Sequence, residues 1–403
     1  MDSNIEIKNN SNFNNLFLNI FIKTNNKIQL ENNMLSGVKN KITKYSRDKK
    51  WDFYKKLTNP YELIYLTKKL DKPFSISNYE PISRSYFKMM EILNEFFIDY
   101  KNDYKKINTF HLAEGPGGFV EAMINFRRNK LDNVYAMTLI SSNKDIPNWN
   151  KIKYFVKRND NIQILVGEDQ KGDLYNVRNH YYIMQNYGKN TMDIVTGDGG
   201  FDFSNDYNSQ EQNSQKLIFS QILMVFSMLK LKGHFICKFF DTYCDLTKEF
   251  IFLLYLFFDS IYIYKPKTSR VANSERYIIC KGYKGCSTLL LCELLNILNI
   301  WNKLDSIKYN IVNILDLKEK KIKSIYNNFL DKLKKINNNL EESQIKNIND
   351  TIQIIENTPS EQFLLNNYNT QIHIAKDWCN KYNIPYKKNF NNQNYKNLYY
   401  LFK

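Results

Sequence analysis

The sequence predicts an α/β protein built around a mostly parallel β-sheet of about seven strands, with helical additions at both ends. Two observations lead to this prediction. Short apolar runs bounded by turn residues alternate with helical stretches between about residues 83 and 282, and only a short link joins the last two runs. Because a parallel pair needs a long crossover connection, the short link indicates a last strand that turns back antiparallel.

Two stretches precede the first predicted strand. Residues 1 to about 15 are rich in Asn and are predicted to be mobile, and the stretch up to about residue 70 mixes apolar and basic residues at helical spacing. The run SRSYFKMMEILNEFFIDY, from Ser83 to Tyr100, then predicts one amphipathic helix.

Seven segments of the chain have the pattern of strands. They are NTFHLA (108–113), NVYAMTL (133–139), NIQILV (161–166), TMDIVTGD (191–198), GHFICKF (233–239), SIYIYKP (260–266) and ERYIICKG (275–282). Helical stretches separate most of them, including FVEAMINFRRN and QKLIFSQILMVFSMLKLK. Beyond about residue 286 we expect no further strand, only helical segments up to about Trp378. This order indicates a Rossmann-like sheet of the kind found in methyltransferases.

The composition favours a polyanionic partner. With 57 Lys+Arg against 41 Asp+Glu the net charge is +16, and 29 Tyr and 27 Phe add stacking capacity, which together favour RNA or single strands. An AT-rich genome, which favours Lys, Asn and Ile codons, explains the charge equally well, because the excess is spread along the chain.

Cysteine spacing and apolar runs limit the remaining classes. The six cysteines show no CxxC pair and no His at zinc-ligand spacing, so we expect a reducing compartment and no metal site. The most apolar run, Phe250 to Phe258, is far shorter than the roughly 20 residues of a membrane span and predicts a buried helix. The N-terminus lacks the pattern of a secretory signal. We therefore expect a soluble, intracellular protein that does not bind membranes.

The stretch HLAEGPGGFVEAM, His111 to Met123, places a glycine-rich turn between a predicted strand and a helix. Backbone N–H groups and a helix N-terminus then face the crevice beyond the strand, where ligands bind. Because the glycine order differs from the dinucleotide and P-loop patterns, S-adenosylmethionine (SAM) fits better than a pyrophosphate. The cationic groups of SAM would be favoured by carbonyls and by Glu114. The alternative is a turn that serves only strand–helix packing.

Three charged residues stand at strand ends of this predicted sheet, and a fourth lies on a helix. Asp198 follows the fourth strand in DIVTGDGGFDF, Lys238 ends the fifth in GHFICKFFD, and Glu275 opens the seventh in SRVANSERYIICKG. Lys88 lies on the helix before the glycine motif. Three of them have a plainer explanation, since Asp-Gly-Gly is a common turn, Lys238 could snorkel to the surface and Lys88 could be an ordinary surface lysine.

Taken in order, SRSYFK, LAEGPGGF, DGGF, GHFICKFFD and SRVANSERYIICKG resemble the FtsJ family of 2'-O-methyltransferases. The resemblance is closest to the cap-specific mRNA methyltransferases of eukaryotes and large DNA viruses, which modify the first transcribed nucleotide. NPYE at 59–62 and MTL at 137–139 also match that subgroup. The resemblance covers about residues 59–285, and WCNKYNIP at 378–385 extends it as a family-like end of the catalytic domain.

The resemblance implies a Lys-Asp-Lys-Glu tetrad carried by Lys88, Asp198, Lys238 and Glu275. In this family the second lysine takes the proton of the ribose 2'-hydroxyl, which requires its neutral form against an ordinary pKa of about 10.4. Lys88 is expected to lower the pKa of Lys238 whereas the two carboxylates raise it, and the sequence leaves the balance open.

The resemblance and the glycine turn together indicate the binding residues. Those expected to bind SAM are Ser83, Glu114, Gly115, Pro116, Gly117, Gly118, Phe119 and Asp173. The acidic residue that many SAM enzymes carry after the second strand is absent from MTLISSN, and Asp173 is expected to compensate. Those expected to bind RNA are Asn208, Ser209, Gln210 and Asn273, and all of these are equally well explained as turn residues.

The expected function is SAM-dependent methylation of the 2'-hydroxyl of the first transcribed nucleotide of capped mRNA, from cap-0 to cap-1. The alternatives are a methyltransferase of ribosomal or other structured RNA, and a catalytically silent FtsJ-like protein that binds RNA or a partner. Expected partners are the capped mRNA 5' end and other capping or transcription proteins, in the cytoplasm, a viral factory, a virion or the nucleus. The predicted organisation is an Asn-rich extension (1–58), a catalytic domain (59–285) and a helical extension packed on it with a basic tail (286–403).

Overall fold

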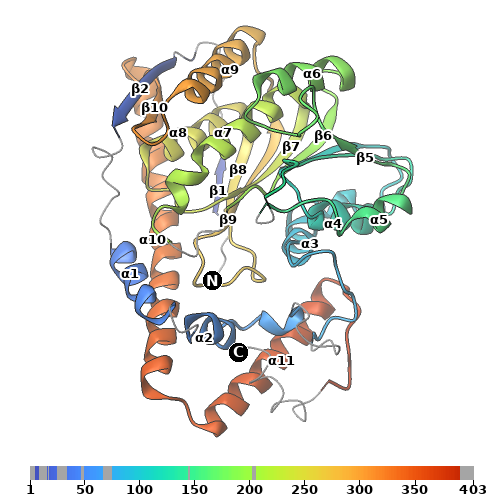
Figure 1. The fold of residues 1–403 in the computed structure, drawn as a ribbon, viewed down its shortest axis with the longest axis vertical. Coiled ribbons are helices and arrows are strands. Elements are labelled where there is room, and N and C mark those ends of the chain that lie inside the picture. The colour runs from blue at the N-terminus through green and yellow to red at the C-terminus, as the bar shows by residue number, and fades with distance from the viewer. Residues whose placement is uncertain are drawn as a thin grey trace. The chain divides into compact units, whose positions relative to one another are not determined.

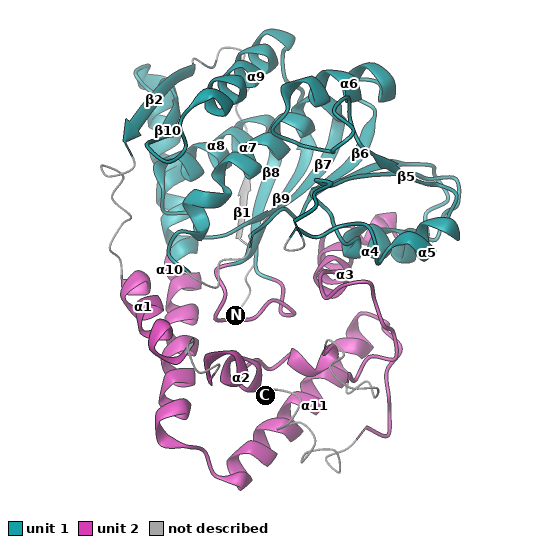
Figure 2. Cartoon of the chain, in the orientation of Figure 1, with its two compact units in different colours: residues 1–31, 102–265, 275–337 teal, residues 32–101, 266–274, 338–403 magenta. Residues whose placement is uncertain are grey.

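A computed structural model describes residues 5–8, 16, 18–24, 34–46, 50–66, 75–143, 146–201 and 206–390. The chain forms two compact units, each assembled from separate stretches of sequence (Figure 2). The first comprises residues 1–31, 102–265 and 275–337, and the second comprises residues 32–101, 266–274 and 338–403. The predicted domain boundaries at residues 58 and 285 stay a prediction. The end of the predicted basic tail, residues 391–403, lies outside the described residues.

The first unit is built around an eight-stranded sheet with the order β1-β8-β9-β7-β6-β3-β4-β5 (Figure 1). Its strands are β1 (Ile5–Lys8), β3 (Asn108–Leu112), β4 (Asn133–Met137), β5 (Ile162–Leu165), β6 (Met192–Gly197), β7 (Leu229–Phe239), β8 (Phe258–Tyr264) and β9 (Arg276–Tyr283). Strands β5, β4, β3, β6 and β7 are parallel to one another, and β9 runs antiparallel to both β7 and β8. The predicted seven-stranded Rossmann-like sheet with an antiparallel last strand is confirmed, and β1 adds an edge strand.

The central strands of the sheet are buried on both faces, which is why their positions could be predicted from the sequence. All six residues of β6 are buried, as expected for a parallel strand covered on both faces, and its apolar residues are interrupted only by Asp193 and Thr196. In the register of the sheet, Leu112 of β3 pairs with Gly197 of β6, which pairs with Cys237 of β7. The segments that follow these three strands therefore emerge side by side at the carboxyl edge of the sheet.

Helices complete the first unit. They are α4 (Gly118–Arg127), α5 (Lys153–Lys157), α6 (Val177–Tyr187), α7 (Gln210–Met228), α8 (Asp245–Phe257), α9 (Thr288–Lys303) and the start of α10 (Lys320–Asn357). Helix α7 packs on β6 and β7, and α8 packs on β8 and β9. Helices α6 and α9 lie beside α7 in the same layer (Figure 1). The predicted buried helix is α8, whose residues from Phe250 to Phe257 are all buried.

Two strands correct the sequence prediction. Strand β10 (Tyr309–Leu315) lies beyond residue 286, where no strand was expected, and it pairs antiparallel with β2 (Leu18–Thr24), which was predicted to be helical. The backbone N–H groups of Ile314 and Leu315 also donate to the carboxylate of Glu249 on α8, at 2.6 and 3.1 Å. This long-range pairing, which local periodicity does not encode, selects the extended conformation. Burial raises the pKa of Glu249 to about 7, against these hydrogen bonds, which lower it.

Strand β1 corrects a further prediction, because residues 5–8 were expected to be mobile. Its backbone pairs antiparallel with β8, from Ile5 opposite Ile263 to Lys8 opposite Ser260. An edge strand with unpaired N–H and C=O groups is a ready partner for another extended segment. The remaining residues of the predicted mobile stretch, 1–4 and 9–15, lie outside the described residues.

The second unit is helical. It contains α1 (Met34–Ser46), α2 (Lys50–Leu57), η2 (Glu62–Ile64), α3 (Ser85–Phe96), η3 (Ile98–Tyr100), the end of α10 and α11 (Glu361–Lys381). The single helix predicted from Ser83 to Tyr100 is thus two helices, because Phe97 leaves the helical conformation at φ −133° and ψ 30°. The side chain of Asn94 donates to the carbonyl of Met90 at 2.7 Å, a local bond of the kind that competes with helix propagation.

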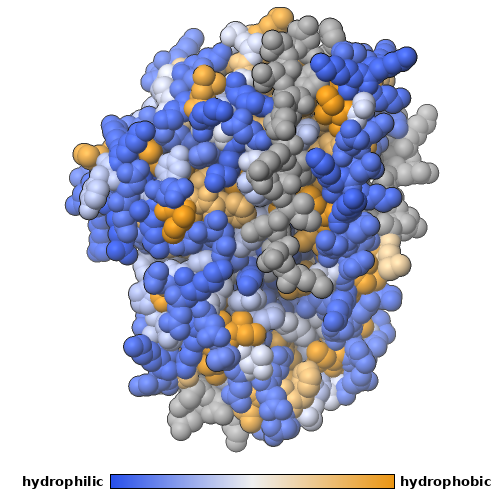
Figure 3. Space-filling view, turned by 180° about the vertical axis from the view of Figure 1, so that it is seen from behind, coloured by the Kyte–Doolittle hydropathy of each residue, from blue (hydrophilic) through white to orange (hydrophobic). Residues whose placement is uncertain are grey.

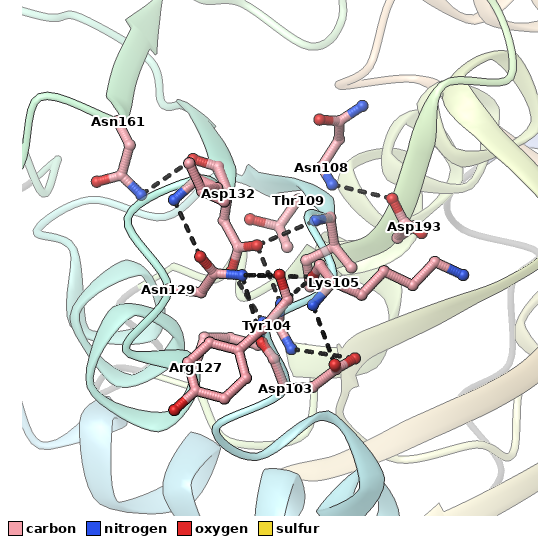
Figure 4. A network of polar contacts seen from close by, with 12 residues as sticks. Asp103, Tyr104, Lys105, Asn108, Thr109, Arg127, Asn129, Asp132, Asn161 and Asp193 are labelled. Atoms are coloured by element: carbon pink, nitrogen blue, oxygen red, sulfur yellow. Dashed lines mark hydrogen bonds and ion pairs between the residues drawn. The ribbon is translucent and has the colours of Figure 1, made fainter.

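The amino edge of the sheet in the first unit holds a buried charge network (Figure 4). Arg127, whose side chain is 1% exposed, donates to both carboxylate oxygens of Asp132 at 2.8 and 3.0 Å and to the carbonyl of Lys105 at 2.6 Å. Asp132 also accepts the backbone N–H of Ile107 at 3.0 Å. Each buried charge of this pair therefore faces an opposite charge and further hydrogen bonds.

No helix within the described ranges has both the length and the apolar character needed to cross a membrane.

Candidate active site

The glycine-rich turn lies at the carboxyl edge of the sheet, between β3 and α4. Glu114 donates its N–H to the carbonyl of Met137 at 3.3 Å, and Gly115 donates its N–H to Thr138 Oγ1 at 3.2 Å. A further bond of 2.7 Å runs from the N–H of Gly117 to the carbonyl of Glu114. The turn is therefore fastened to the end of β4, and α4 begins directly after it at Gly118.

Two glycines of the turn are required by the protein's own chain. Gly117 has φ +115°, a left-handed conformation that favours glycine, and a Cβ there would lie 2.3 Å from Ile152 Cδ1. A Cβ on Gly115 would lie 2.5 Å from the carbonyl oxygen of Pro147. Close packing of the segment 146–152 thus accounts for both glycines, so the glycine pattern by itself does not require a ligand.

Glu114 gives the independent indication of a ligand. Its Oε1 accepts the N–H of Phe119, whereas its Oε2 is buried and has no hydrogen-bond partner among the described residues. Burial, and secondly the charge of Asp198, raise the pKa of Glu114 well above its ordinary value. A buried carboxylate oxygen without a donor is costly in a finished protein interior. This oxygen therefore suits a ligand that brings a positive charge or an N–H group.

Lys238 and Asp198 form a direct pair beside this turn. Lys238 Nζ, at the end of β7, donates to the carbonyl of Asp198 at 2.8 Å and lies 3.3 Å from Asp198 Oδ1. Both side chains are largely buried, with 13% and 14% of their surfaces exposed. A Cβ on Gly200 would come within 2.9 Å of Lys238 Nζ, so the Asp-Gly-Gly turn closes directly over the amine. The lysine does not snorkel to the surface.

Tyr277 contacts Asp198 of this pair, and it was not among the residues predicted from the sequence. Its hydroxyl donates to Asp198 Oδ1 at 3.0 Å, and its ring lies 5.9 Å from the ring of Phe119 at the start of α4. In the antiparallel ladder, Tyr277 is directly opposite Lys238. Tyr277 lies two residues after Glu275, but a tyrosine in an apolar strand has the ordinary appearance of a core residue, so no pattern in the sequence singled it out.

The charges around Lys238 in the first unit shift its pKa. Burial lowers the pKa of Lys238, but the carboxylates of Asp198, Glu275 and Glu114 raise it by more, and the net direction is upward. Within the first unit, one lysine thus faces three carboxylates. The charged side chains at this edge are therefore mostly acidic, whereas the chain as a whole has a net positive charge.

Residues 81–283, half of the chain, match the family of FtsJ-like methyltransferases. The chain belongs to this family. The cap-specific mRNA (nucleoside-2'-O-)-methyltransferase 1 of Mus musculus and that of Homo sapiens are each 34% identical to the chain over 181 residues. These matches cover 43% of this chain and 21% of each relative, so the chain spans about a fifth of their length.

One solved structure, from Plasmodium falciparum and named as a ribosomal RNA methyltransferase, covers 51% of the chain and 99% of its own length at 18% identity and a TM-score of 0.36.

Thr138 and Asp173 belong to neighbouring loops of the FtsJ-like sheet. Thr138, which receives the N–H of Gly115, also approaches the loop after β5, since a Cβ on Gly172 would lie 2.3 Å from its carbonyl oxygen. Asp173 follows directly, and its Oδ1 accepts the N–H of Tyr175 at 2.8 Å. Asp173 is thus held in a turn beside the end of β4, while its predicted contact with SAM stays a prediction.

The expected RNA-binding residues after Asp198 lie at the start of α7. Asn208 donates its N–H to Asp206 at 2.9 Å, the hydroxyl of Ser209 donates to the carbonyl of Asp206 at 3.2 Å, and Gln210 opens the helix. These contacts are those of a turn that starts a helix. A role in binding RNA stays a prediction, and residues 202–205 of the same loop lie outside the described residues.

Three predicted site residues belong to the second unit of the FtsJ-like chain. Lys88 is a half-buried residue of α3, and Ser83 shares a 2.6 Å hydrogen bond with Ser85 at the start of that helix. Asn273 donates its N–H to the carbonyl of Arg270 at 3.0 Å within the loop 266–274. Their membership of the tetrad, the SAM site and the RNA site stays a prediction.

Two buried carboxylates fix the loop 266–274 within the second unit. Glu62 accepts Arg270 at 2.7 and 3.0 Å and Arg84 at 2.8 Å, and the charges of these arginines hold its pKa at about 2 in spite of burial. Glu91 accepts the N–H groups of Lys267 and Thr268 at 2.7 and 3.2 Å. The loop that carries Asn273 is therefore rigidly supported at several points.

Proposed function

We propose that the chain transfers a methyl group from SAM to the ribose 2'-hydroxyl of the first transcribed nucleotide of capped mRNA, which converts cap-0 to cap-1. The observation that carries this proposal is the buried pair of Lys238 and Asp198 beside Glu114, at the carboxyl edge of an FtsJ-like sheet. Family membership supports methyl transfer, and the similarity to the cap-specific relatives supports capped mRNA as the substrate.

The residues of the glycine turn fit SAM. Glu114 Oε2 supplies a buried acceptor without a donor, and the acidic excess around Lys238 favours a cationic ligand. The turn from Glu114 to Phe119 would hold the amino-acid part, and Asp173 together with Ser83 would hold the remainder. When bound, SAM supplies an electrophilic methyl group on a positively charged sulfur.

Lys238 is the proposed general base. Its Nζ would take the proton of the 2'-hydroxyl as the ribose oxygen bonds to the methyl carbon and the carbon–sulfur bond breaks. Asp198 fixes the position of the amine through two contacts, and Tyr277 holds Asp198 in turn. Because three carboxylates keep Lys238 protonated, a second cation is needed to release the neutral amine, and Lys88 is the proposed source.

The RNA side of the site is proposed to involve the loop 266–274 and the segment that opens α7. Glu62 and Glu91 give Asn273 a rigid support, which suits a residue that must orient a substrate. Asn208, Ser209 and Gln210 would contact the strand next to the reacting ribose. Other capping or transcription proteins are proposed as partners on the basis of the substrate alone.

A methyl-transfer assay with labelled SAM tests this proposal. Three RNAs of one sequence are compared: capped, capped with a 2'-O-methyl group already on the first nucleotide, and uncapped. The proposal expects incorporation only into the first. Equal incorporation into uncapped RNA would point to structured or ribosomal RNA, and no incorporation into any RNA would point to a catalytically silent member of the family.

A further inference from the structure

The first half of α10 carries a dense lysine face that the proposed active site does not use. Seven lysines occur between residues 318 and 335, six of them on the helix and one just before it, against Glu319 and Asp331, and all seven are exposed. They are Lys318, Lys320, Lys321, Lys323, Lys332, Lys334 and Lys335. The second half of the helix, residues 338–357, reverses the balance with Lys346 against four acidic residues. The positive charge is therefore local to one half of one helix.

The opposite side of this half-helix is fixed to the first unit. Ile322, Tyr326, Phe329, Leu333 and Ile336 are buried. The rings of Tyr326 and Phe329 lie 4.9 and 5.3 Å from that of Phe252 on α8. This apolar stripe follows the 3.6-residue period of a helix, so the lysines between its members face solvent.

The lysine half ends at the edge of the sheet that carries the proposed site. Asn337, which is buried, accepts Thr242 Oγ1 at 2.7 Å and Arg276 at 3.1 Å, and its amide donates to the carbonyl of Thr242 at 3.2 Å. Thr242 lies just beyond β7, after Lys238, and Arg276 directly follows Glu275. The helix is thus bonded to the two strand ends from which Lys238 and Glu275 emerge, so the lysine face has a fixed position relative to them.

We propose that the lysine face of α10, from Lys320 to Lys335, together with Lys318 just before the helix, binds the phosphate backbone of the RNA that continues from the methylated nucleotide. This inference rests on the proposed function for the identity of the polyanion. Lysines on a flexible stem bind phosphates as point charges without reading sequence, which suits an enzyme that accepts many mRNAs. From Lys320 to Lys335 the helix rises about 22 Å, enough to follow several nucleotides.

An anionic membrane is a poorer occupant for this face. Helices that lie on membranes insert an apolar stripe into the lipid, whereas the apolar stripe of this half-helix is buried in the protein. The face of the molecule seen in Figure 3 is mostly hydrophilic, with hydrophobic residues in small groups. An acidic protein remains a distinct outcome that the experiment separates.

The test compares two triple variants of the full chain. Lys332, Lys334 and Lys335 are replaced by Gln in the first, and Lys130, Lys189 and Lys232 in the second. The control lysines are exposed and lie at the amino edge of the sheet, before or at the start of β4, β6 and β7. Both variants lose the same charge, and thermal melting checks that both stay folded. Binding of a long capped RNA is measured by fluorescence anisotropy over a series of salt concentrations.

The first variant is expected to bind the long RNA about tenfold more weakly than wild type. The slope of log affinity against log salt should fall by about 2, because each phosphate that a lysine no longer neutralises lowers it by roughly 0.7. The control should match wild type. In methyl transfer, the first variant should show a higher KM for long capped RNA and an unchanged KM for a capped dinucleotide.

Equal RNA affinity in the first variant and wild type, or equal losses in both variants, would overturn the proposal. Binding of polyglutamate in preference to RNA, lost in the first variant, would overturn it in favour of an acidic protein. If the wild-type chain methylates no capped RNA and only the first variant loses RNA binding, the result supports the lysine face as an RNA-binding surface and contradicts the proposed function.

Discussion

The two edges of the sheet in the first unit both bury charge, but they do so in opposite ways. At the amino edge, Arg127 and Asp132 form a two-bond pair in which further backbone groups satisfy the remaining donors and acceptors (Figure 4). At the carboxyl edge, Lys238 faces three carboxylates, and one oxygen of Glu114 has no donor among the described residues. Among the residues that the structure describes, the first arrangement is complete, whereas the second is not.

We propose that the charges at the amino edge stabilise the fold and that those at the carboxyl edge serve the reaction. In a matched buried pair, all donors and acceptors are already satisfied, so a ligand has nothing to add. Removing one partner leaves the other charge buried and unpaired, which lowers the free energy of unfolding. In a cluster with unequal numbers of acidic and basic groups, a charged ligand can supply the missing charge. Clusters of this kind, with strongly shifted pKa values, often mark functional sites. The comparison predicts that substitutions at the carboxyl edge change activity and that substitutions at the amino edge change stability.

The largest expected effect is that of Lys238→Met, which removes the proposed base while keeping the length of the side chain. Single-turnover methyl transfer to capped RNA should fall by about 10²- to 10⁴-fold, the usual contribution of a general base. Affinity for SAM, measured by calorimetry, should stay within a few-fold of wild type. Lys232→Met is the matched control, because Lys232 lies on the same strand at the amino edge and is 76% exposed. A fully active Lys238→Met variant would assign the base elsewhere.

The next effect concerns Arg127→Met at the amino edge. Because Asp132 would stay buried without its partner, the free energy of unfolding should fall by about 3–5 kcal/mol. Urea unfolding followed by circular dichroism measures this loss. At low temperature, the folded variant should keep the wild-type rate of methyl transfer. A stable variant with a reduced rate would reverse the roles assigned to the two edges.

The pH dependence of the rate tests the charges around Lys238. Its carboxylate neighbours raise the pKa of Lys238, so at neutral pH the amine is mostly protonated and only a small fraction can act as a base. Below that pKa, the neutral fraction and the single-turnover rate should both rise about tenfold per pH unit. A rate that is flat or that falls as the pH rises through neutrality would contradict a role for the neutral amine.

The smallest effect is that of Glu114→Gln, which removes the charge and preserves the shape. Affinity for SAM should fall by about tenfold, or roughly 1.4 kcal/mol. Wild-type affinity should also strengthen as the pH rises and Glu114, with its raised pKa, ionises, and the variant should lose that dependence. Glu168→Gln, an exposed residue after β5, is the control. Unchanged affinity in Glu114→Gln would exclude this carboxylate from the cation site.

Much of the sheet was predictable from sequence because its strands are short, buried apolar runs bounded by turn residues. The proximity of Asp198 and Lys238 was predictable because each lies at the end of such a run, and parallel strands end at one edge. Tyr277 was not, since an aromatic residue in a buried strand has the ordinary appearance of core, and only the pairing of β9 with β7 places it opposite Lys238.

Other features depend on partners that are remote in the chain. Strand β10 forms because β2, nearly 300 residues earlier, pairs with it, and because Glu249 accepts its N–H groups. The glycines of the turn were interpreted as a cradle for a ligand, yet Ile152 and Pro147 already require two of them. Local periodicity contains neither kind of contact.

The central claim is tested most directly by locating the methyl group on the product. Capped RNA is incubated with the wild-type chain and SAM, digested with nucleases, and the first nucleotide is analysed by mass spectrometry. The account predicts one added methyl group on the ribose of that nucleotide, absent from the reaction with Lys238→Met. Methylation on a base, on an internal ribose, or at an equal level with the variant would contradict it.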